Sequence, residues 1–274
     1  MITIQNPHFQ ISQICDSGQC FRMRPIEDGR YSLVAKDRYL EISQKQDRIT
    51  FSCSPQEYEE IWEDYFDLKT DYGAFLREID RTDIYLAKAA EFGCGIRILK
   101  QDLWEMIISF LISQQNNIKR IRRCIELICE RYGEERQSEN GIFYHAFPTI
   151  QALAESAEED LRACNLGYRA RYLKRSAQSI LNGEADLEAV RKMPYPQARE
   201  ALMKLTGVGG KVADCICLFA LHQLEAFPVD THIRQAMERQ YPAGFPHEVY
   251  GECGGVMQQY IFFYELKGNP QRNQ

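Results

Sequence analysis

Residues 205–230 read LTGVGGKVADCICLFALHQLEAFPVD, and this stretch decides how the rest of the chain is interpreted. Its first part, 205–211, places two apolar anchors around a tight glycine turn, and the almost wholly apolar run 212–221 predicts a buried helix. A helix that begins directly after glycines presents unpaired N–H groups and the positive end of its dipole, which suits a phosphate. The alternative is a plain helix–helix turn, and buried Val208 with small Ala213 favours the phosphate-binding hairpin.

Lys211 and Asp230 add chemistry to this hairpin. Burial and the helix dipole both favour the uncharged, nucleophilic form of an amine placed where Lys211 stands. Lys211 could also be a surface residue at a helix start, and Asp230 could be a simple N-cap for a helix beginning at Thr231. The residues alone leave these alternatives open. Together, a phosphate-binding hairpin, a lysine and a carboxylate predict cleavage of a bond in nucleic acid.

Composition excludes several other classes of protein. The 274 residues, 45% hydrophobic and 26% charged, are typical of a folded globular chain, and no apolar run reaches membrane-spanning length. The start, MITIQNPHFQ, lacks a secretory signal, so we expect the ten cysteines to be free thiols. Without any CxxC or CxxH pair, no metal site is predicted. A net charge of −6 means that contacts with DNA must come from local cationic patches.

The hydrophobic pattern predicts an α+β fold in two domains. Segments 31–35, 39–43 and 48–52 alternate apolar and polar residues, which indicates an antiparallel sheet with one solvated face. After a capping box at 54–57 the pattern becomes helical almost to the end. We expect a small N-terminal sheet domain with helices over 1–90, and a mostly helical domain carrying the hairpin over 91–274. The expected helices span 55–66, 70–78, 83–92, 102–114, 117–132, 149–153, 157–164, 169–182, 186–192, 196–204, 211–222, 230–239 and 248–266.

Three further helical segments and one turn carry residues of interest. Four cations fall within 119–123 at a helix start, and Tyr168 and Arg169 follow a glycine before more cations. Gln258 and Phe262 are spaced to share one face of the last helix. Taken singly, such residues usually belong to solvated faces, loops or the core, and Gly18 usually marks only a turn.

Taken together, these motifs resemble the 8-oxoguanine DNA glycosylase/AP lyase family of the helix–hairpin–helix (HhH-GPD) glycosylase superfamily. The resemblance covers nearly the whole chain, whereas the hairpin alone would indicate only the superfamily. The segments that carry it are SGQCFR (17–22), NNIKRI (116–121), LGYRARY (166–172), GVGGKVADCICL (207–218), PVDTH (228–232) and QQYIF (258–262).

This resemblance implies the catalytic roles. Lys211 would attack C1′ of the damaged nucleotide, displace the base and form a Schiff base that permits β-elimination, with Asp230 assisting the amine and stabilising charge on the sugar. Cys215 and Phe262 would hold the flipped base between them, and Gln258 would read its Watson–Crick edge.

The resemblance also assigns the remaining contacts. The carbonyl of Gly18 would accept the N7 hydrogen that 8-oxoguanine has and guanine lacks. Tyr168 would fill the gap left by the flipped base, Arg169 and Arg120 would contact the orphaned cytosine, and His232 would contact phosphate.

The amides of Gly207 and Gly209 would bind the DNA backbone, with room for a coordinated monovalent cation, and no cofactor is required. Gln115 and Asn116 would lie near the orphaned base. Gln115 stands where animal members have the first of three asparagines, and Lys119 where a small residue is common, so the preference for the opposite base stays open.

The expected protein is therefore a monomeric, bifunctional DNA repair enzyme of a prokaryotic cytoplasm, acting on double-stranded DNA that contains 8-oxoguanine. Two alternatives remain. A monofunctional alkylbase glycosylase would need only Asp230, and a non-catalytic hairpin module would need neither Lys211 nor Gln258.

Overall fold

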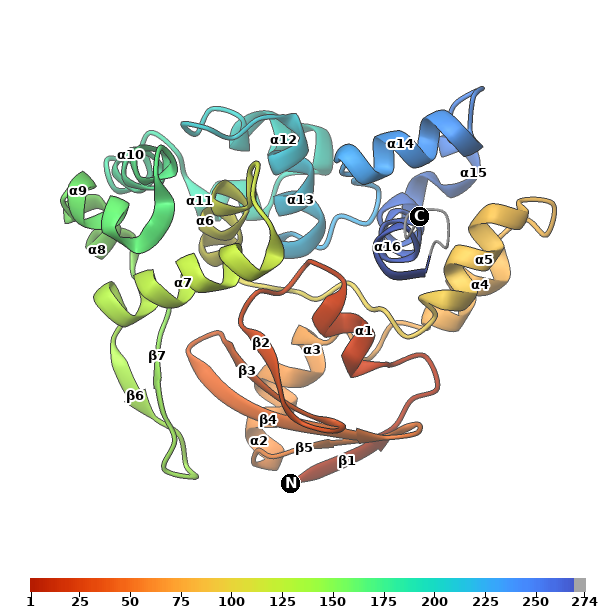
Figure 1. Cartoon of the computed structure of the whole chain (residues 1–274), viewed down its shortest axis with the longest axis horizontal. Helices are drawn as coiled ribbons and strands as arrows, with labels where there is room; N and C mark the ends of the chain where they lie inside the picture. The colour runs from red at the N-terminus through yellow and green to blue at the C-terminus, as the bar shows by residue number, and fades with distance from the viewer. Residues whose placement is uncertain (269–274) are drawn as a thin grey trace.

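The computed structural model describes residues 1–268 and has the predicted α+β architecture, with one antiparallel sheet below a larger group of helices (Figure 1). The sheet contains five strands in the order β1-β5-β4-β3-β2. Their bounds are β1 Ile2–Gln5, β2 Met23–Glu27, β3 Arg30–Ala35, β4 Arg38–Lys45 and β5 Arg48–Phe51.

Alternation and tight turns set the register of this sheet. Leu33 and Leu40 face each other across β3 and β4 and are fully buried, as are Ile49 and Phe51 on β5. The turn between β3 and β4 uses Lys36 and Asp37, whose φ angles of 47° and 58° suit a two-residue hairpin turn. The three predicted strands are thus confirmed, while the alternation did not reveal β1 and β2 at the two edges of the sheet.

The helices begin where the chain supplies side-chain caps. Ser54, Asp83, Asp102, Asn117, Thr149, Asp186 and Asp230 each accept a hydrogen bond from a backbone N–H of the first turn. The helical segments are α1 Ile11–Asp16, α2 Pro55–Glu57, η1 Tyr58–Trp62, α3 Glu63–Tyr65, α4 Tyr72–Glu78, α5 Ile84–Phe92, α6 Leu103–Ser113, α7 Ile118–Tyr132, α8 Ile150–Glu155, α9 Glu158–Leu161, η2 Arg162–Leu166, α10 Arg169–Leu181, α11 Leu187–Arg191, α12 Tyr195–Leu202, α13 Gly210–Ala220, α14 Thr231–Gln240, α15 His247–Tyr250, η3 Gly251–Cys253, α16 Gly254–Phe263 and η4 Tyr264–Gly268.

Most predicted helices are confirmed to within a few residues, with one correction. The segment 248–266 is not one helix, because α15 ends at Tyr250 and a 3-10 turn over Gly251–Cys253 separates it from α16. Glycines at 251, 254 and 255 weaken the helix here. A Cβ on Gly255 would lie 2.6 Å from the carbonyl oxygen of Ala226, so this backbone packs closely on the segment before Asp230.

The sequence pattern also missed the short hairpin β6 Glu135–Gln137 and β7 Phe143–His145, which runs beside the sheet in Figure 1. Its Tyr144 hydroxyl donates to the carbonyl of Asp37 at 3.1 Å, and Arg22 donates to the carbonyl of His145. This hairpin therefore fastens the helical part to the sheet.

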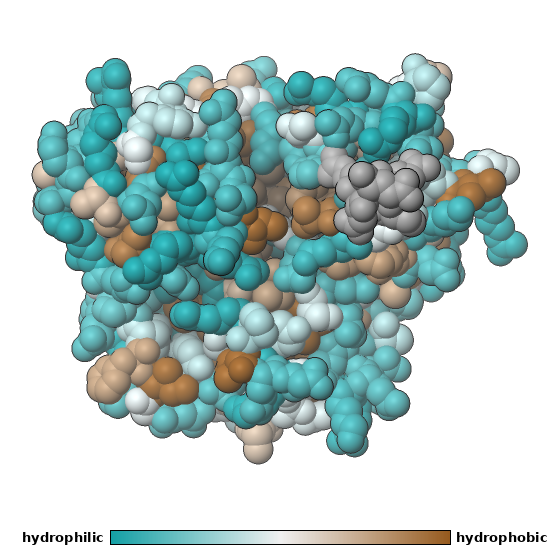
Figure 2. All heavy atoms as spheres, viewed as in Figure 1, coloured by the Kyte–Doolittle hydropathy of each residue, from teal (hydrophilic) through white to brown (hydrophobic). Residues whose placement is uncertain are grey.

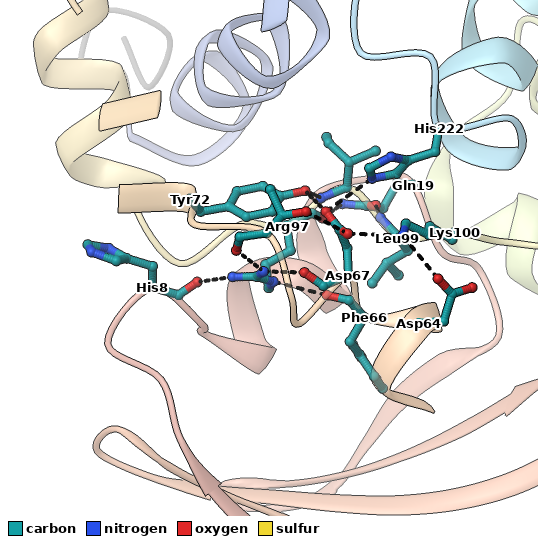
Figure 3. Close-up of polar contacts among 12 residues, drawn as sticks. His8, Gln19, Asp64, Phe66, Asp67, Tyr72, Arg97, Leu99, Lys100 and His222 are labelled. Carbon is teal, nitrogen blue, oxygen red and sulfur yellow. Dashed lines mark hydrogen bonds and ion pairs between the residues drawn. The ribbon is translucent and has the colours of Figure 1, made fainter. Parts of the chain in front are cut away.

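A buried polar network joins the sheet domain to the end of α13 (Figure 3). Arg97 is fully buried and donates to the carbonyls of Phe66 at 2.9 Å, His8 at 3.2 Å and Thr70 at 2.8 Å. The carboxylate of Asp67 lies 3.2 Å from Nε2 of His222, which follows α13. The network fixes α13 against the first hundred residues of the chain.

The chain crosses between the two hydrophobic cores near residue 98. Leu99 packs with the sheet core, whereas Ile96 and Ile98 belong to the helical core together with Tyr72 and Leu86. The division at residue 90 stays a prediction. In the described part of the chain, no helix is long and apolar enough to cross a membrane.

Candidate active site

The predicted hairpin joins α12 to α13 and is shaped by Gly207. Its φ is +86°, and a Cβ there would lie 2.6 Å from the ring of Tyr172, so only glycine fits. Leu205 and Val208 are buried as the two anchors of the turn. Gly209 is the N-cap of α13, has no side-chain cap and is exposed, which leaves N–H groups free to bind an anion.

Lys211 and Asp230 line one cavity, as the sequence predicts. Lys211 lies in the first turn of α13, half-buried, with Nζ 5.6 Å from the ring centre of Phe110. Asp230 is the N-cap of α14, and its Oδ1 accepts from the N–H of Ile233 at 2.8 Å. The capping role of Asp230 is confirmed, and its place in the cavity keeps a catalytic role available as well.

The cavity of about 60 Å³ brings together residues that are far apart in sequence. Gly18, Lys211, Cys215, Asp230, Gln258 and Phe262 all line it, so the six predicted catalytic and base-binding residues converge. Sequence reasoning missed its other lining residues: Ser17, Phe110, Phe219, Pro228 and Gln259. Phe110 and Phe219 stack with ring centres 5.6 Å apart and close the inner side with apolar surface. As ordinary core aromatics of apolar helices, they carry no sequence signal of their own.

Gln258 is held in one orientation inside this cavity. Only 3% exposed, it donates from Nε2 to the carbonyl of Pro228 at 3.0 Å and accepts on Oε1 from Gln259 at 3.0 Å. The first contact fixes which end of the amide is the donor. The glutamine in an apolar helix thus obtains the polar partners that its burial requires.

Gly18 and Phe262 approach each other across the cavity. Gly18 has φ +75°, and a Cβ on it would lie 3.1 Å from Cε1 of Phe262, so both conformation and space require glycine. Gln19 secures this turn by donating to Ser17 Oγ and to the carbonyl of Arg97, both at 2.9 Å.

The thiol of Cys215 is buried beside Lys211. Burial raises the pKa of this thiol, and the nearby charge of Lys211 opposes the rise without overcoming it. The thiol therefore stays protonated near neutral pH and offers a polarisable, uncharged surface to a base.

A second group of predicted residues lies around the loop that follows α6. Gln115 is exposed with φ 47°, while Asn116 is half-buried and donates from Nδ2 to the carbonyl of Ile112 at 3.1 Å. Arg120 is exposed, and Tyr168 is 44% exposed at the start of α10. These four side chains stand outside the cavity lining.

Arg169 differs from its neighbours because it is only 5% exposed. It donates to the carbonyl of Gln114 and, at 3.1 Å, to that of Gln115, and its guanidinium lies 4.6 Å from the ring centre of Tyr168. In this structure Arg169 supports the loop, and its predicted contact with the orphaned base stays a prediction.

One face of α10 serves both the loop and the hairpin. Arg169 holds the loop, Tyr172 packs under Gly207, and Ser176 donates to the carbonyl of Thr206 at 3.2 Å. Gln114 Nε2 completes the connection by donating to the carbonyl of Gly207 at 3.1 Å.

His232 lies on α14, beside the cavity. Its ring centre is 6.0 Å from that of Phe262, in an edge-to-face arrangement.

The face of the molecule shown in Figure 2 is mostly hydrophilic. Apolar patches are exposed near its centre.

Two family models together match residues 1–248. The model for the 8-oxoguanine DNA glycosylase N-terminal domain matches residues 1–107, and that for the HhH-GPD superfamily of base excision DNA repair proteins matches residues 108–248. The chain belongs to the 8-oxoguanine DNA glycosylase family of this superfamily.

Curated relatives and a solved structure agree with this assignment. The N-glycosylase/DNA lyase of Saccharomyces cerevisiae is 40% identical over 54% of this chain and 42% of its own length. A probable N-glycosylase/DNA lyase of Methanothermobacter thermautotrophicus is 34% identical over 72% of this chain and 71% of its own. The 8-oxoguanine glycosylase/lyase of Clostridium acetobutylicum, in complex with double-stranded DNA containing cytosine opposite 8-oxoguanine, has 35% identity and a TM-score of 0.90, covering 100% of this chain and 99% of that one.

For this member of the 8-oxoguanine DNA glycosylase family, the similarity extends beyond the two models. Gln258 and Phe262 follow residue 248, where the second model ends, and both lie within the region matched to the Clostridium structure.

Proposed function

We propose that this chain is a bifunctional glycosylase and AP lyase that removes 8-oxoguanine from double-stranded DNA and then nicks the strand. The convergence of Lys211 and Asp230 with Gly18, Cys215, Gln258 and Phe262 in one cavity carries the proposal. A base buried in a duplex must leave the stack to reach such a cavity, and the apolar and thiol surfaces inside can offset that cost.

The chemistry begins at Lys211. Its neutral amine attacks C1′, the N-glycosidic bond breaks, and the base departs with the bonding electrons. The amine then loses a proton, the C1′–O4′ bond of the sugar ring breaks while O4′ takes up a proton, and C1′ becomes joined to Nζ as a Schiff base. A proton leaves C2′, the C3′–O bond breaks, and the 3′ phosphate is released. The carboxylate of Asp230 stabilises positive charge that develops on the sugar during the first step.

Recognition of the lesion rests on fixed hydrogen-bonding groups. The carbonyl of Gly18 is an acceptor that cannot be protonated, which suits the N7–H of 8-oxoguanine and not the bare N7 of guanine. Gln258, whose amide is fixed by its bonds with Pro228 and Gln259, would read the edge of a flipped base held between Cys215 and Phe262.

Binding to the duplex uses the exposed groups around the cavity. The amides of Gly207 and Gly209 contact the DNA backbone, and His232 contacts phosphate. If a monovalent cation binds, the backbone of the hairpin would hold it. Tyr168 fills the gap in the stack, and Gln115, Asn116, Arg120 and Arg169 face the orphaned base. We further propose that the protein acts as a monomer, without a required cofactor, in a prokaryotic cytoplasm.

Borohydride trapping tests the proposal directly. The unmodified chain is expected to form a covalent complex with an 8-oxoguanine duplex, because borohydride reduces a Schiff base to a stable amine. Lys211→Gln should form none, and Lys204→Gln, a nearby exposed lysine, should trap normally. Trapping by Lys211→Gln would show that Lys211 is not the nucleophile. Release of 3-methyladenine without trapping would favour the monofunctional alkylbase enzyme, and binding without base release or nicking would favour a non-catalytic module.

A further inference from the structure

A second hollow, of about 1020 Å³, opens between the sheet domain and the helices. It is lined by the β3–β4 turn, the first turn of α6, residues 147–150, the segment between α10 and α11, and the end of α13. Small-molecule sites have this size and are built from apolar walls with a few polar groups. The hollow, termed here the α6–α13 cleft, has such walls in Trp104, Phe147, Ile150 and Leu221.

The α6–α13 cleft is separate from the catalytic cavity. Both are lined by α6 and α13, but no described residue lines both of them. Trp104 and Glu105 at the start of α6 line the cleft, whereas Phe110, further along, lines the catalytic cavity. On α13 the cleft uses Ala220 at the end, and the cavity uses Lys211, Cys215 and Phe219 on other sides of the helix.

Glu105 is a buried acid in the lining of this cleft. It is only 8% exposed, and no hydrogen bond or ion pair from residues 1–268 reaches its carboxylate. Helix capping does not account for it. Asp102 accepts from the N–H of Glu105 at 2.9 Å, but within the described chain the reciprocal bond that would complete a capping box is missing. Arg22 acts on this carboxylate through its charge, but in the described chain it forms no ion pair with it. A buried carboxylate that no ion pair neutralises is costly when ionised, so its place at the cleft wall points to a cationic ligand.

The cations of the cleft cannot fill this role, because each is already paired. Their pairs are Lys36 with Asp64 at 3.8 Å, Lys100 with Asp64 at 3.0 Å and Asp67 at 3.1 Å, and Arg191 with Asp102 at 3.3 Å and Glu188 at 3.4 Å. The lining holds six acidic residues against these three cations, which leaves it net negative. No group of three metal-binding side chains occurs in the part of the chain that is described, so the cleft suits an organic cation better than a metal ion.

We propose that the α6–α13 cleft binds a small organic ammonium ion, whose charged head pairs with the carboxylate of Glu105 and whose carbon skeleton packs on Trp104 and Phe147. The aromatic walls favour such a ligand twice, through apolar contact and through attraction between a cation and the ring faces. The inference does not depend on the glycosylase activity.

Protonation of Glu105 gives the binding a pH dependence. The pKa of Glu105 is raised to about 7, mainly by burial; the charge of Arg22 opposes the rise, and the charges of Asp102 and Asp37 add to it. The other titratable groups that interact with Glu105 are Cys20, Tyr65 and Cys129, whose own pKa values burial raises, so they stay neutral. Binding should therefore strengthen from about pH 6 to about pH 8, because the carboxylate ionises while the ammonium keeps its charge.

Benzylamine is the test ligand, and benzyl alcohol is its neutral match. At about pH 8, calorimetry on the intact protein should detect binding of benzylamine and far weaker binding of benzyl alcohol. Glu105→Gln should weaken benzylamine binding at least ~10-fold, because glutamine keeps the shape of the side chain but lacks its negative charge. Glu188→Gln, a carboxylate of the same cleft already paired with Arg191, should change it less than about twofold.

A second variant keeps the proposal testable if Glu105→Gln fails to fold. Ala185→Trp would fill the cleft from its wall and should abolish benzylamine binding, with excision of 8-oxoguanine unchanged. The proposal is overturned if the unmodified chain does not bind benzylamine, if the alcohol binds equally well, or if folded Glu105→Gln or Ala185→Trp binds as the natural chain does.

Discussion

The catalytic cavity and the loop after α6 solve two recognition problems in different ways. In the cavity, Cys215 and Gln258 are each 3% exposed, and the amide of Gln258 is held by Pro228 and Gln259. In the loop, Gln115 is exposed and only its backbone is held, by Arg169. The side chains of Cys215 and Gln258, proposed to bind the lesion, are thus buried, whereas those of Gln115 and Arg120, proposed to face the orphaned base, lie on the surface of a supported backbone. Substitutions should therefore be far more damaging in the first region than in the second.

The largest expected effect is that of Asp230→Asn. Asparagine caps a helix as well as aspartate does, so α14 should stay intact and the melting temperature nearly unchanged. The lost negative charge should slow release of 8-oxoguanine about 1000-fold in single-turnover assays. Asp186→Asn, at the N-cap of α11, is the matched control and should leave the rate unchanged. A near-normal rate in Asp230→Asn would show that this carboxylate serves only as the N-cap of α14.

Gln258→Ala separates reading of the base from the chemistry. Removing one buried partner of the base should lower 8-oxoguanine release roughly 10- to 100-fold. Cleavage at a preformed abasic site, where no base is read, should keep its rate. An equal loss of rate on both substrates would mean that the variant disturbs the cavity in general. It would then not support a contrast between the cavity and the loop after α6.

Gln115→Asn probes the loop and should have a smaller effect. The φ of 47° at this position is less costly for asparagine than for glutamine, so the free energy of unfolding should rise by about 0.5 kcal/mol. Thermal unfolding measures this change, and excision opposite each of the four bases measures selectivity. We expect the rate opposite cytosine to change less than about threefold while the ratios among opposite bases shift. A collapse of excision opposite every base would show that the loop is as sensitive as the cavity.

The smallest expected effect concerns acid stability, away from both regions. Burial alone would raise the pKa of Asp67, but hydrogen bonds from His222 and Thr70 and the charge of Lys100 lower it to about 2. The ordinary pKa of an aspartate is about 3.9, so the ionised carboxylate stabilises the fold above about pH 4, and this contribution is lost as pH falls toward about 2. Asp67→Asn should flatten the dependence of unfolding free energy on pH in this window. An unchanged slope would place the acid sensitivity in other groups.

The sequence was sufficient to predict three strands of the sheet, most helices and six of the residues that line the cavity. Alternation revealed β3, β4 and β5 because one face of the sheet is buried and the other is not. Gly18, Cys215 and Gln258 could be grouped in advance only through the family resemblance, since their spacing in the chain says nothing about proximity.

Other features depend on tertiary packing that no local pattern encodes. Phe110 and Phe219 look like core residues of two apolar helices, and only the packing of α6 on α13 makes them part of the cavity. The break between α15 and α16 comes just before Gly255, whose backbone packs closely on Ala226. The burial of Arg169 was likewise hidden, because a run of cations at 169–175 predicts a solvated surface.

The face of α10 has a mechanical consequence. Arg169 and Ser176 are seven residues apart in one helix, so the points where α10 holds the loop and the hairpin are about 10 Å apart along its axis. Because a helix does not stretch, this separation fixes the distance between the loop after α6 and the hairpin before α13, which are proposed to contact the two DNA strands. Motion of α10 during binding would carry both contacts as one rigid body, so the spacing between the loop and the hairpin would be the same in the free and the bound enzyme.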